Sequence, residues 1–213
     1  MLYGKIMIKY LIKFVSRLEH AKMLQDGHLF MRPMSYYRLS EEGQGDELEG
    51  AISHSIFMFK NTQWPIYCFY SVDDSEMFAD GNVEIPKSCI EDFKCKDGYI
   101  VIIKFSEFEK LLPRIDTEGY QLSAGKVSYH NIAFEELANL IKKETLDNVF
   151  IKRPKYSYQK EYRIVITNNI SSGKDHITYE MSSDIKSISN VIAVSTLKTN
   201  DEGCLVLPKE MLL

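Results

Sequence analysis

Short runs of β-branched and aromatic residues, separated by turn residues, recur along most of this chain. Three follow one another at residues 53–59, 65–72 and 97–105, and the last is apolar almost throughout. Such composition and length are typical of β-strands, and a nearly continuous apolar run indicates a strand covered on both faces. We expect further strands at residues 125–131, 161–167, 176–181 and 191–197.

Helical spacing is found in fewer places. Leu18, Ala21 and Leu24 recur with the period of a helix, and Gly27 follows them as a stop that can adopt a left-handed conformation. This helix should lie between two short strands, the second ending at Pro33.

Two more helices are expected later in the chain. Ser106 and Glu109 have the spacing of a capping box, and residues 134–154 form the strongest amphipathic pattern. With no internal repeat, the pattern predicts one α+β domain over residues 1–213, built on a mostly antiparallel, split sheet with a few packed helices.

Residues 34–51 are polar, rich in glycine and acidic, which predicts a surface loop. Loops of this kind often carry binding groups. Asp46 and Glu49 belong to it, but the acidic residues lack the spacing of a calcium loop. The four cysteines form no C-x-x-C pair. We therefore predict no metal site.

Charge and hydropathy narrow the class of protein. The 213 residues carry a formal net charge of -4, which argues against coating nucleic acid over the whole surface and leaves room for a local basic patch. No apolar run reaches the roughly 18 residues of a membrane span. Lysines interrupt the first residues at Lys5, Lys9 and Lys13, unlike a signal peptide, so we expect a cytoplasmic protein with no membrane partner.

The segment from Lys152 to Ile166, KRPKYSYQKEYRIVI, has the most suggestive chemistry. If its second half is extended, Gln159, Glu161 and Arg163 share one face. A carboxylate there could accept a ribose hydroxyl and stabilise an oxocarbenium-like centre, while the amide orients an acceptor. Nearby cations, Arg163 above all, should keep Glu161 ionised.

A plainer interpretation remains open for the same residues. Glu161 with Arg163 or Lys155 could form only a surface ion pair at the end of a strand, worth about 0 to 1 kcal/mol. Tyrosines of the segment, Tyr158 among them, serve as ordinary packing or as a stacking surface for bases or a nicotinamide ring.

Earlier in the chain, Arg32 ends the second strand and Tyr36 and Tyr37 follow it. An arginine placed there could bind a pyrophosphate through paired hydrogen bonds. Cys68 should be an inert thiol in a strand, with Ser71 at the more exposed end of that strand. No nucleophile motif for a hydrolase is present.

The order of several segments resembles a broad, largely uncharacterised family of bacterial and phage proteins. The matching pieces are LQDGHLFM, YYRLSEEGQGDELEG, IYCFYS, GKVSYHN and KYSYQKEYRIVI. That layout is similar in turn to the DarT-like and wider ADP-ribosyltransferase architecture, in which a late strand opens with the catalytic glutamate.

The resemblance implies catalytic roles for Glu161 and for Gln159, the latter as part of a Q-x-E acceptor element. It implies NAD as the substrate, with Arg17 or Arg32 as the dinucleotide contact. We add four candidate cofactor-binding residues: Tyr36, Tyr37, Ser71 and Tyr158.

The leading hypothesis is therefore an NAD-consuming ADP-ribosyltransferase of bacterial toxin or phage-conflict type. Its acceptor would be a nucleobase, a protein side chain or water. The alternative is a non-catalytic module that binds a nucleotide or a protein partner and acts as a phage or host inhibitor. A metal-dependent nuclease using Asp46 and Glu49 is a third hypothesis.

Overall fold

The computed structural model describes residues 7–39, 63–112, 121–131, 146–167 and 175–213. Contacts divide the chain into two compact units, each assembled from separated segments. Unit 1 consists of Met1–His28, Phe69–Leu112 and Glu180–Leu213, and unit 2 consists of Leu29–Cys68 and Pro113–Tyr179. That the whole chain folds as one domain stays a prediction.

Unit 1 is built on antiparallel strands. β1 (Ile8–Val15) pairs on one side with the C-terminal part of β3 (Pro65–Asp73) and on the other with β5 (Tyr99–Lys104). β11 (Ser189–Ala193) pairs with the far edge of β5. The apolar run in β5 is buried from Ile100 to Ile103, which confirms its prediction as a central strand.

Short helices accompany these strands. They are α1 (Leu18–Gln25), α3 (Lys87–Asp92) and α4 (Phe105–Phe108), with single 3-10 turns η2 (Asp74–Glu76), η3 (Glu109–Leu111), η6 (Lys186–Ile188), η7 (Val194–Thr196) and η8 (Lys209–Met211). α1 lies where it was predicted, and Gly27 after it has a φ of 87°. Ser106 is not the N-cap of α4, because the helix already begins at Phe105. Lys104 is the N-cap residue, and its side chain makes no capping hydrogen bond.

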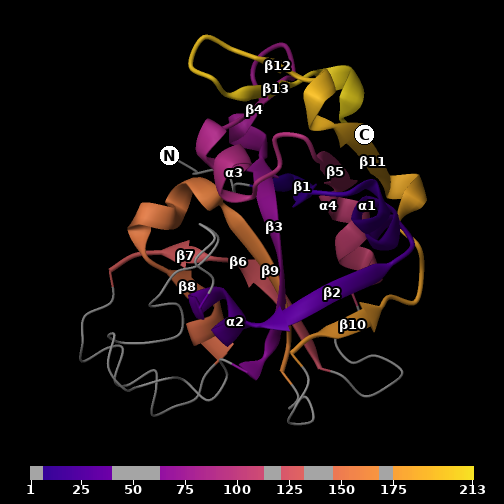
Figure 1. The fold of residues 1–213 in the computed structure, drawn as a ribbon, viewed down its shortest axis with the longest axis vertical. Coiled ribbons are helices and arrows are strands. Elements are labelled where there is room, and N and C mark those ends of the chain that lie inside the picture. Colours follow the sequence, from indigo (N-terminus) through magenta and orange to yellow (C-terminus); the bar gives the residue numbers. More distant parts are fainter. Residues whose placement is uncertain (1–6, 40–62, 113–120, 132–145, 168–174) are drawn as a thin grey trace, which may run out of the picture. The chain divides into compact units, whose positions relative to one another are not determined.

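A small antiparallel sheet completes unit 1. It consists of β12 (Lys198–Thr199), β13 (Leu205–Leu207) and β4 (Val83–Ile85), which lie together in Figure 1. None of the three was predicted. Strands of two or three residues are too short to show a period in the sequence.

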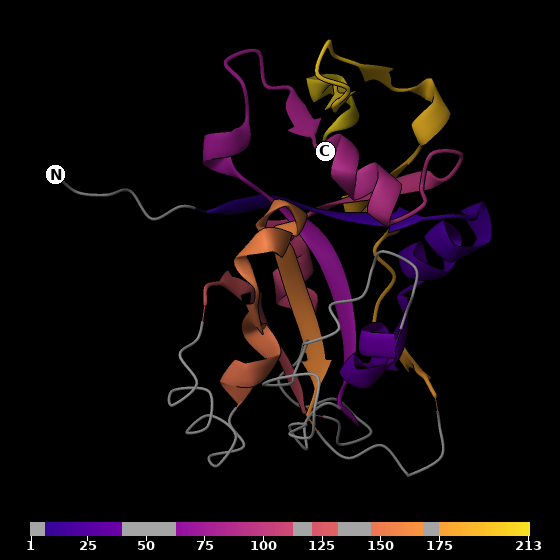
Figure 2. The same cartoon turned by 60° about the vertical axis from the view of Figure 1, so that its left-hand side comes forward.

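Unit 2 has a second set of mostly antiparallel strands. Their order is β10 (Ile177–Glu180), β2 (His28–Pro33), the N-terminal part of β3, β9 (Glu161–Ile166) and β6 (Leu122–Lys126). Figure 2 shows β9 running alongside β3. A separate parallel pair joins β7 (Ser128–Tyr129) to β8 (Ile151–Lys152).

The helical segments of unit 2 are α2 (Met34–Leu39), η4 (Leu146–Phe150) and η5 (Pro154–Gln159). α2 corrects the prediction of a loop directly after Pro33. Its first residue, Met34, is buried in a core cluster with Ile66, Val149 and Val165, so tertiary packing holds this polar turn as a helix.

Several predicted elements can be compared only in part. Residues 40–51, the strand at 53–59 and the first part of the amphipathic helix lie outside the described residues. The described part of that expected helix, from Leu146 to Lys152, is instead the turn η4 followed by β8. The mixed α and β class with mostly antiparallel strands and few helices agrees with the sequence-based prediction.

Candidate functional site

The strand β9 begins with Glu161, and two cations lie against its carboxylate inside unit 2. Lys152 Nζ lies 2.5 Å from Oε1, and Arg163 Nε lies 2.7 Å from Oε2. The exposed fractions of the Lys152, Glu161 and Arg163 side chains are 3%, 7% and 1%. Both carboxylate oxygens are therefore bound to cations in the protein interior.

The sequence of β9 explains this position. All of its residues are buried, and the period of two places Glu161, Arg163 and Val165 on one face. Val165 packs in the cluster that also holds Val149, and Arg163 donates a hydrogen bond from Nη1 to the Val149 carbonyl oxygen at 2.6 Å. The guanidinium thus has a carboxylate and a carbonyl among its acceptors.

Gln159 reaches the same ammonium as Glu161 from a different element. Gln159 ends η5, and its Oε1 accepts a hydrogen bond from Lys152 Nζ at 2.7 Å. The intervening Lys160 has a left-handed conformation, with φ 41° and ψ 47°. The prediction that Gln159 and Glu161 point the same way is confirmed, but the expected reason was wrong, because Gln159 is not part of the strand.

The amide nitrogen of Gln159 is a buried donor. The residue is 1% exposed, and Nε2 has no hydrogen-bond partner among the described residues. The orientation of the amide is fixed, since an ammonium can only donate and must face the carbonyl oxygen. An amide donor is therefore held beside the carboxylate.

Electrostatics keep Glu161 ionised. Burial raises the pKa of the carboxyl, but the charges and hydrogen bonds of Arg163 and Lys152 outweigh burial and hold the pKa well below its ordinary value. This confirms the prediction of an ionised Glu161. The predicted surface ion pair is corrected in two respects: the pair is buried, and its lysine is Lys152 rather than Lys155.

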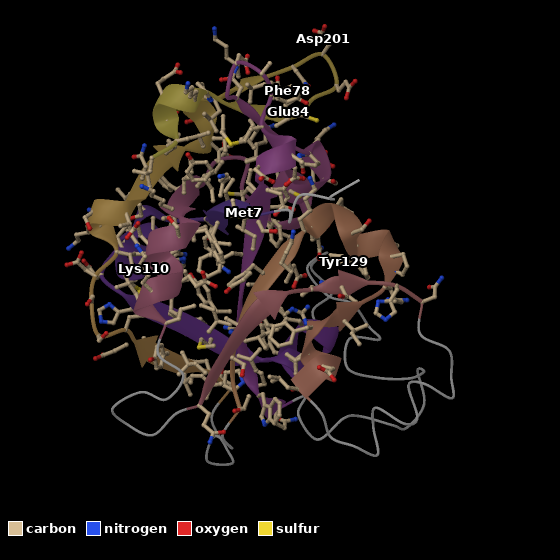
Figure 3. All side chains as sticks on the ribbon, turned by 180° about the vertical axis from the view of Figure 1, so that it is seen from behind. Met7, Phe78, Glu84, Lys110, Tyr129 and Asp201 are labelled. Atoms are coloured by element: carbon tan, nitrogen blue, oxygen red, sulfur yellow. The ribbon has the colours of Figure 1, made fainter. Side chains whose placement is uncertain are left out.

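Tyr129 on β7, labelled in Figure 3, borders the same group. Its hydroxyl oxygen accepts the backbone N–H of Glu161 at 2.8 Å. Burial, and then the negative charge of Glu161, raise the pKa of Tyr129, so the phenol stays neutral. Tyr129 fixes the first residue of β9 from the backbone side.

Cationic groups also surround Tyr156 in η5. The ring centroid lies 4.9 Å from Lys152 Nζ, 5.5 Å from the guanidinium carbon of Arg153 and 4.7 Å from Lys155 Nζ. We call these four residues the Tyr156 cluster. The ammonium of Lys152 belongs both to this cluster and to the interior group around Glu161.

Among the residues predicted to bind a cofactor, Arg32 and Tyr36 come together. The guanidinium carbon of Arg32 lies 3.9 Å from the centroid of the Tyr36 ring, which is a stacking distance. Tyr37 packs edge-on against Tyr36 and also contacts the core cluster of Met34, so it has a packing role.

The other three predicted residues lie elsewhere. Tyr158 is half-buried in η5 of unit 2. Arg17 is exposed and precedes α1 in unit 1. Ser71 is 0% exposed, which corrects the expectation of an accessible position, because β3 continues to Asp73 and Ser71 pairs with Leu11 inside the sheet.

Sequence reasoning did not single out Lys152 or Tyr129. Lys152 was placed in the amphipathic helix, where a lysine reads as part of the solvent face. One feature of the sequence could have indicated a buried Lys152: it follows Phe150 and Ile151, two apolar residues of a strand-like run. Nothing in the local pattern indicates that Tyr129 contacts β9.

No group of His, Cys, Asp and Glu side chains suited to a metal ion occurs among the described residues. The acidic loop with Asp46 and Glu49 lies outside them. Within the part of the chain that the structure describes, no helix has both the length and the apolar character needed to cross a membrane. The chain matches no protein-family model, no curated protein and no solved structure at a significant level.

Proposed function

We propose that unit 2 is a non-catalytic binding module for a phosphate-bearing nucleotide. The observation that carries this proposal is the state of Glu161, whose two carboxylate oxygens are both bound to cations in the interior. A carboxylate engaged in this way stabilises the fold, and the exposed Lys155 is the cation of the Tyr156 cluster that can meet a ligand. The resemblance to phage and bacterial proteins adds the role of an inhibitor in phage conflict to this proposal.

The Tyr156 cluster supplies suitable chemistry for phosphate and base. Lys155 and Arg153 bring an exposed ammonium and a half-buried guanidinium to one aromatic ring. Guanidinium and ammonium groups bind phosphate oxygens, and an aromatic ring can stack on a base. A local positive patch attracts such a ligand in a protein of net charge -4, while the remaining surface repels it.

The test is calorimetric titration of the full chain with ATP, at low and moderate salt. Tyr156→Leu and Lys155→Gln should each weaken binding, and salt should weaken it further. Lys198→Gln, which changes an exposed lysine in unit 1, is the matched control and should bind ATP like the wild type. Absence of ATP binding, or equal binding by all four proteins, would contradict the module.

A second candidate function is favoured by a specific observation. Glu161 is ionised, as a glutamate that stabilises a cationic ribose must be, and the unmatched Gln159 amide lies beside it. In that reaction the bond between nicotinamide and ribose breaks, and its electron pair leaves with nicotinamide. A nucleobase, protein side chain or water then bonds to the ribose carbon and loses a proton. Lys152 would have to give up Oε1 of Glu161 to a ribose hydroxyl.

The enzyme hypothesis is tested by measuring free nicotinamide after incubation with NAD, with and without nucleic acid. Release by the wild type that collapses in Glu161→Gln, assayed at a temperature where the variant is still folded by circular dichroism, would establish the enzyme and overturn the non-catalytic module. No release by the wild type would leave the binding module as the function of this site.

A further inference from the structure

We propose that exposed and half-buried side chains of β2, α2 and the residue just before β10 form a stacking platform for the bases of single-stranded nucleic acid. The proposal deepens the nucleotide-binding function and rests on it, because it names a polynucleotide as the ligand of unit 2. Figure 1 shows β2 leading into α2 at one end, with β10 beside it.

Four flat groups follow one another on this surface, and we call them the stacking ladder: Tyr36, Arg32, Phe30 and His176. The Arg32 guanidinium carbon lies 3.9 Å from the Tyr36 ring centroid and 5.3 Å from that of Phe30. The rings of Phe30 and His176 stack with centroids 4.5 Å apart and 30° between their planes. The contacts form an unbroken row from α2 across β2 to His176, the residue that precedes β10.

Local sequence produces this row. β2 alternates, burying Leu29, Met31 and Pro33 and turning Phe30 and Arg32 to the opposite face. α2 begins directly after the strand and brings Tyr36 back over Arg32. An apolar Phe on the solvent face of a strand is therefore followed two residues later by the arginine that stacks on it.

Three aromatic side chains of the ladder are exposed to solvent. Phe30 is 40% exposed, Tyr36 is 44% exposed and the side chain of His176 is 44% exposed. Aromatic faces with an interleaved arginine are the common means of holding unpaired bases, because every base has a π-face and the arginine adds cation–π attraction. Because the inner groups stack on one another, bases of one strand would stack on the rings that end the row, Tyr36 and His176, each 44% exposed.

Charge around the ladder is mixed but compatible with this ligand. Asp175 Oδ1 lies 2.6 Å from His176 Nδ1, and the hydrogen bond from His176 lowers the pKa of Asp175, with a smaller contribution from the charge of Arg32. The Asp175 carboxylate is thus paired with His176, which reduces its repulsion of a phosphate. The cation of the ladder itself is Arg32.

The experiment is fluorescence anisotropy of the full chain with a labelled oligo-dT of about 20 nucleotides, longer than the site of a typical single-strand binding domain. Tyr36→Ala should weaken binding about tenfold, the loss expected for one stacked base. Tyr36→Phe keeps the ring and should bind like the wild type. Phe78→Ala removes an aromatic side chain that is 50% exposed in unit 1, and is the matched control.

Arg32→Gln and Arg17→Gln form a second matched pair. The first should weaken oligo-dT binding and the second should not, because only Arg32 lies in the ladder. The same oligonucleotide annealed to its complement should bind more weakly than the single strand, since pairing hides the base faces. Equal affinity of wild type and Tyr36→Ala, equal affinity for single and double strands, or no binding of oligo-dT would overturn the proposal.

Failure of the ladder can be told apart from failure of the nucleotide module. If ATP binding depends on Tyr156 while oligo-dT binding ignores Tyr36, the module stands and the ladder is wrong. If oligo-dT binding depends on Tyr36 while ATP does not bind, the ladder stands and the Tyr156 cluster is not a nucleotide site.

Discussion

Lys152 and Glu161, nine residues apart in the chain, form a buried ion pair with Nζ and Oε1 2.5 Å apart. Arg163 binds the other oxygen, so the three side chains carry a net positive charge inside unit 2. Desolvation of such charges is costly in free energy. The attraction between the charges offsets this cost only because each carboxylate oxygen contacts a cation at short distance. Replacing any one of the three side chains should therefore lower the free energy of unfolding, even without a ligand.

Replacement of the lysine tests this directly. Lys152→Met removes a cation from Glu161 and an ammonium donor from Gln159. We expect a loss of about 3–5 kcal/mol in the free energy of unfolding, as for other broken buried pairs, measured by urea denaturation. Lys155→Met, an exposed lysine of the same segment, should change stability by less than about 0.5 kcal/mol. Equal stability of both variants would show that the buried pair contributes nothing.

Acid should weaken the protein through Glu161. The pKa of this carboxyl is lowered in the folded state, so the unfolded state binds its proton at higher pH. The stabilisation is complete above the unfolded value of about 4.3 and is lost as pH falls towards the lowered folded pKa. The difference in urea midpoint between wild type and Glu161→Gln should therefore shrink below about pH 4. A constant difference down to low pH would contradict the lowered pKa.

Two glycines, Gly98 just before β5 and Gly125 in β6, should respond differently to alanine. A Cβ at Gly98 would lie 2.4 Å from the Val15 carbonyl oxygen and 2.8 Å from Cys95 Sγ, so the backbone would have to move. Gly98→Ala should destabilise by about 1–3 kcal/mol. Gly125→Ala meets Phe150 only at 3.6 Å, an ordinary contact, and should be close to neutral. Thermal denaturation of both variants measures the contrast.

The cysteines should differ in reactivity. Cys89 is fully buried, and burial raises the pKa of its thiol to about 12. Burial also raises the pKa of Cys95, which donates to the carbonyls of Val15 and Tyr99. Cys68 lies in β3 as expected but is partly exposed rather than enclosed, and Cys204 is also partly exposed. Iodoacetamide at neutral pH should label these two before Cys89 and Cys95, as followed by mass spectrometry of the native protein. Early labelling of Cys89 would contradict the packing around it.

Elements with a strong local pattern were predictable. β1, α1 and β2 follow the expected order, with Gly27 at the turn, because apolar spacing and a glycine stop act within a few residues. β5 and β9 were recognised from their β-branched runs for the same reason.

The missed elements depend on contacts between distant residues. α2 follows a proline and has a polar sequence, and it is anchored by Met34 in a cluster with Val149 and Val165. The left-handed residue between η5 and β9 is Lys160 rather than a glycine, so the sequence does not indicate this conformation. Neither feature has a periodic signal.

The amino-acid sequence alone predicted that Glu161 opens a strand, shares its face with Arg163 and is kept ionised by cations, because period-two alternation and charge are local properties. Only the tertiary structure decided that Lys152 is its second partner and that both cations are buried with it. That pairing requires β8, η5 and β9 to meet around one ammonium, and such a meeting is set by packing of the whole unit rather than by neighbouring residues.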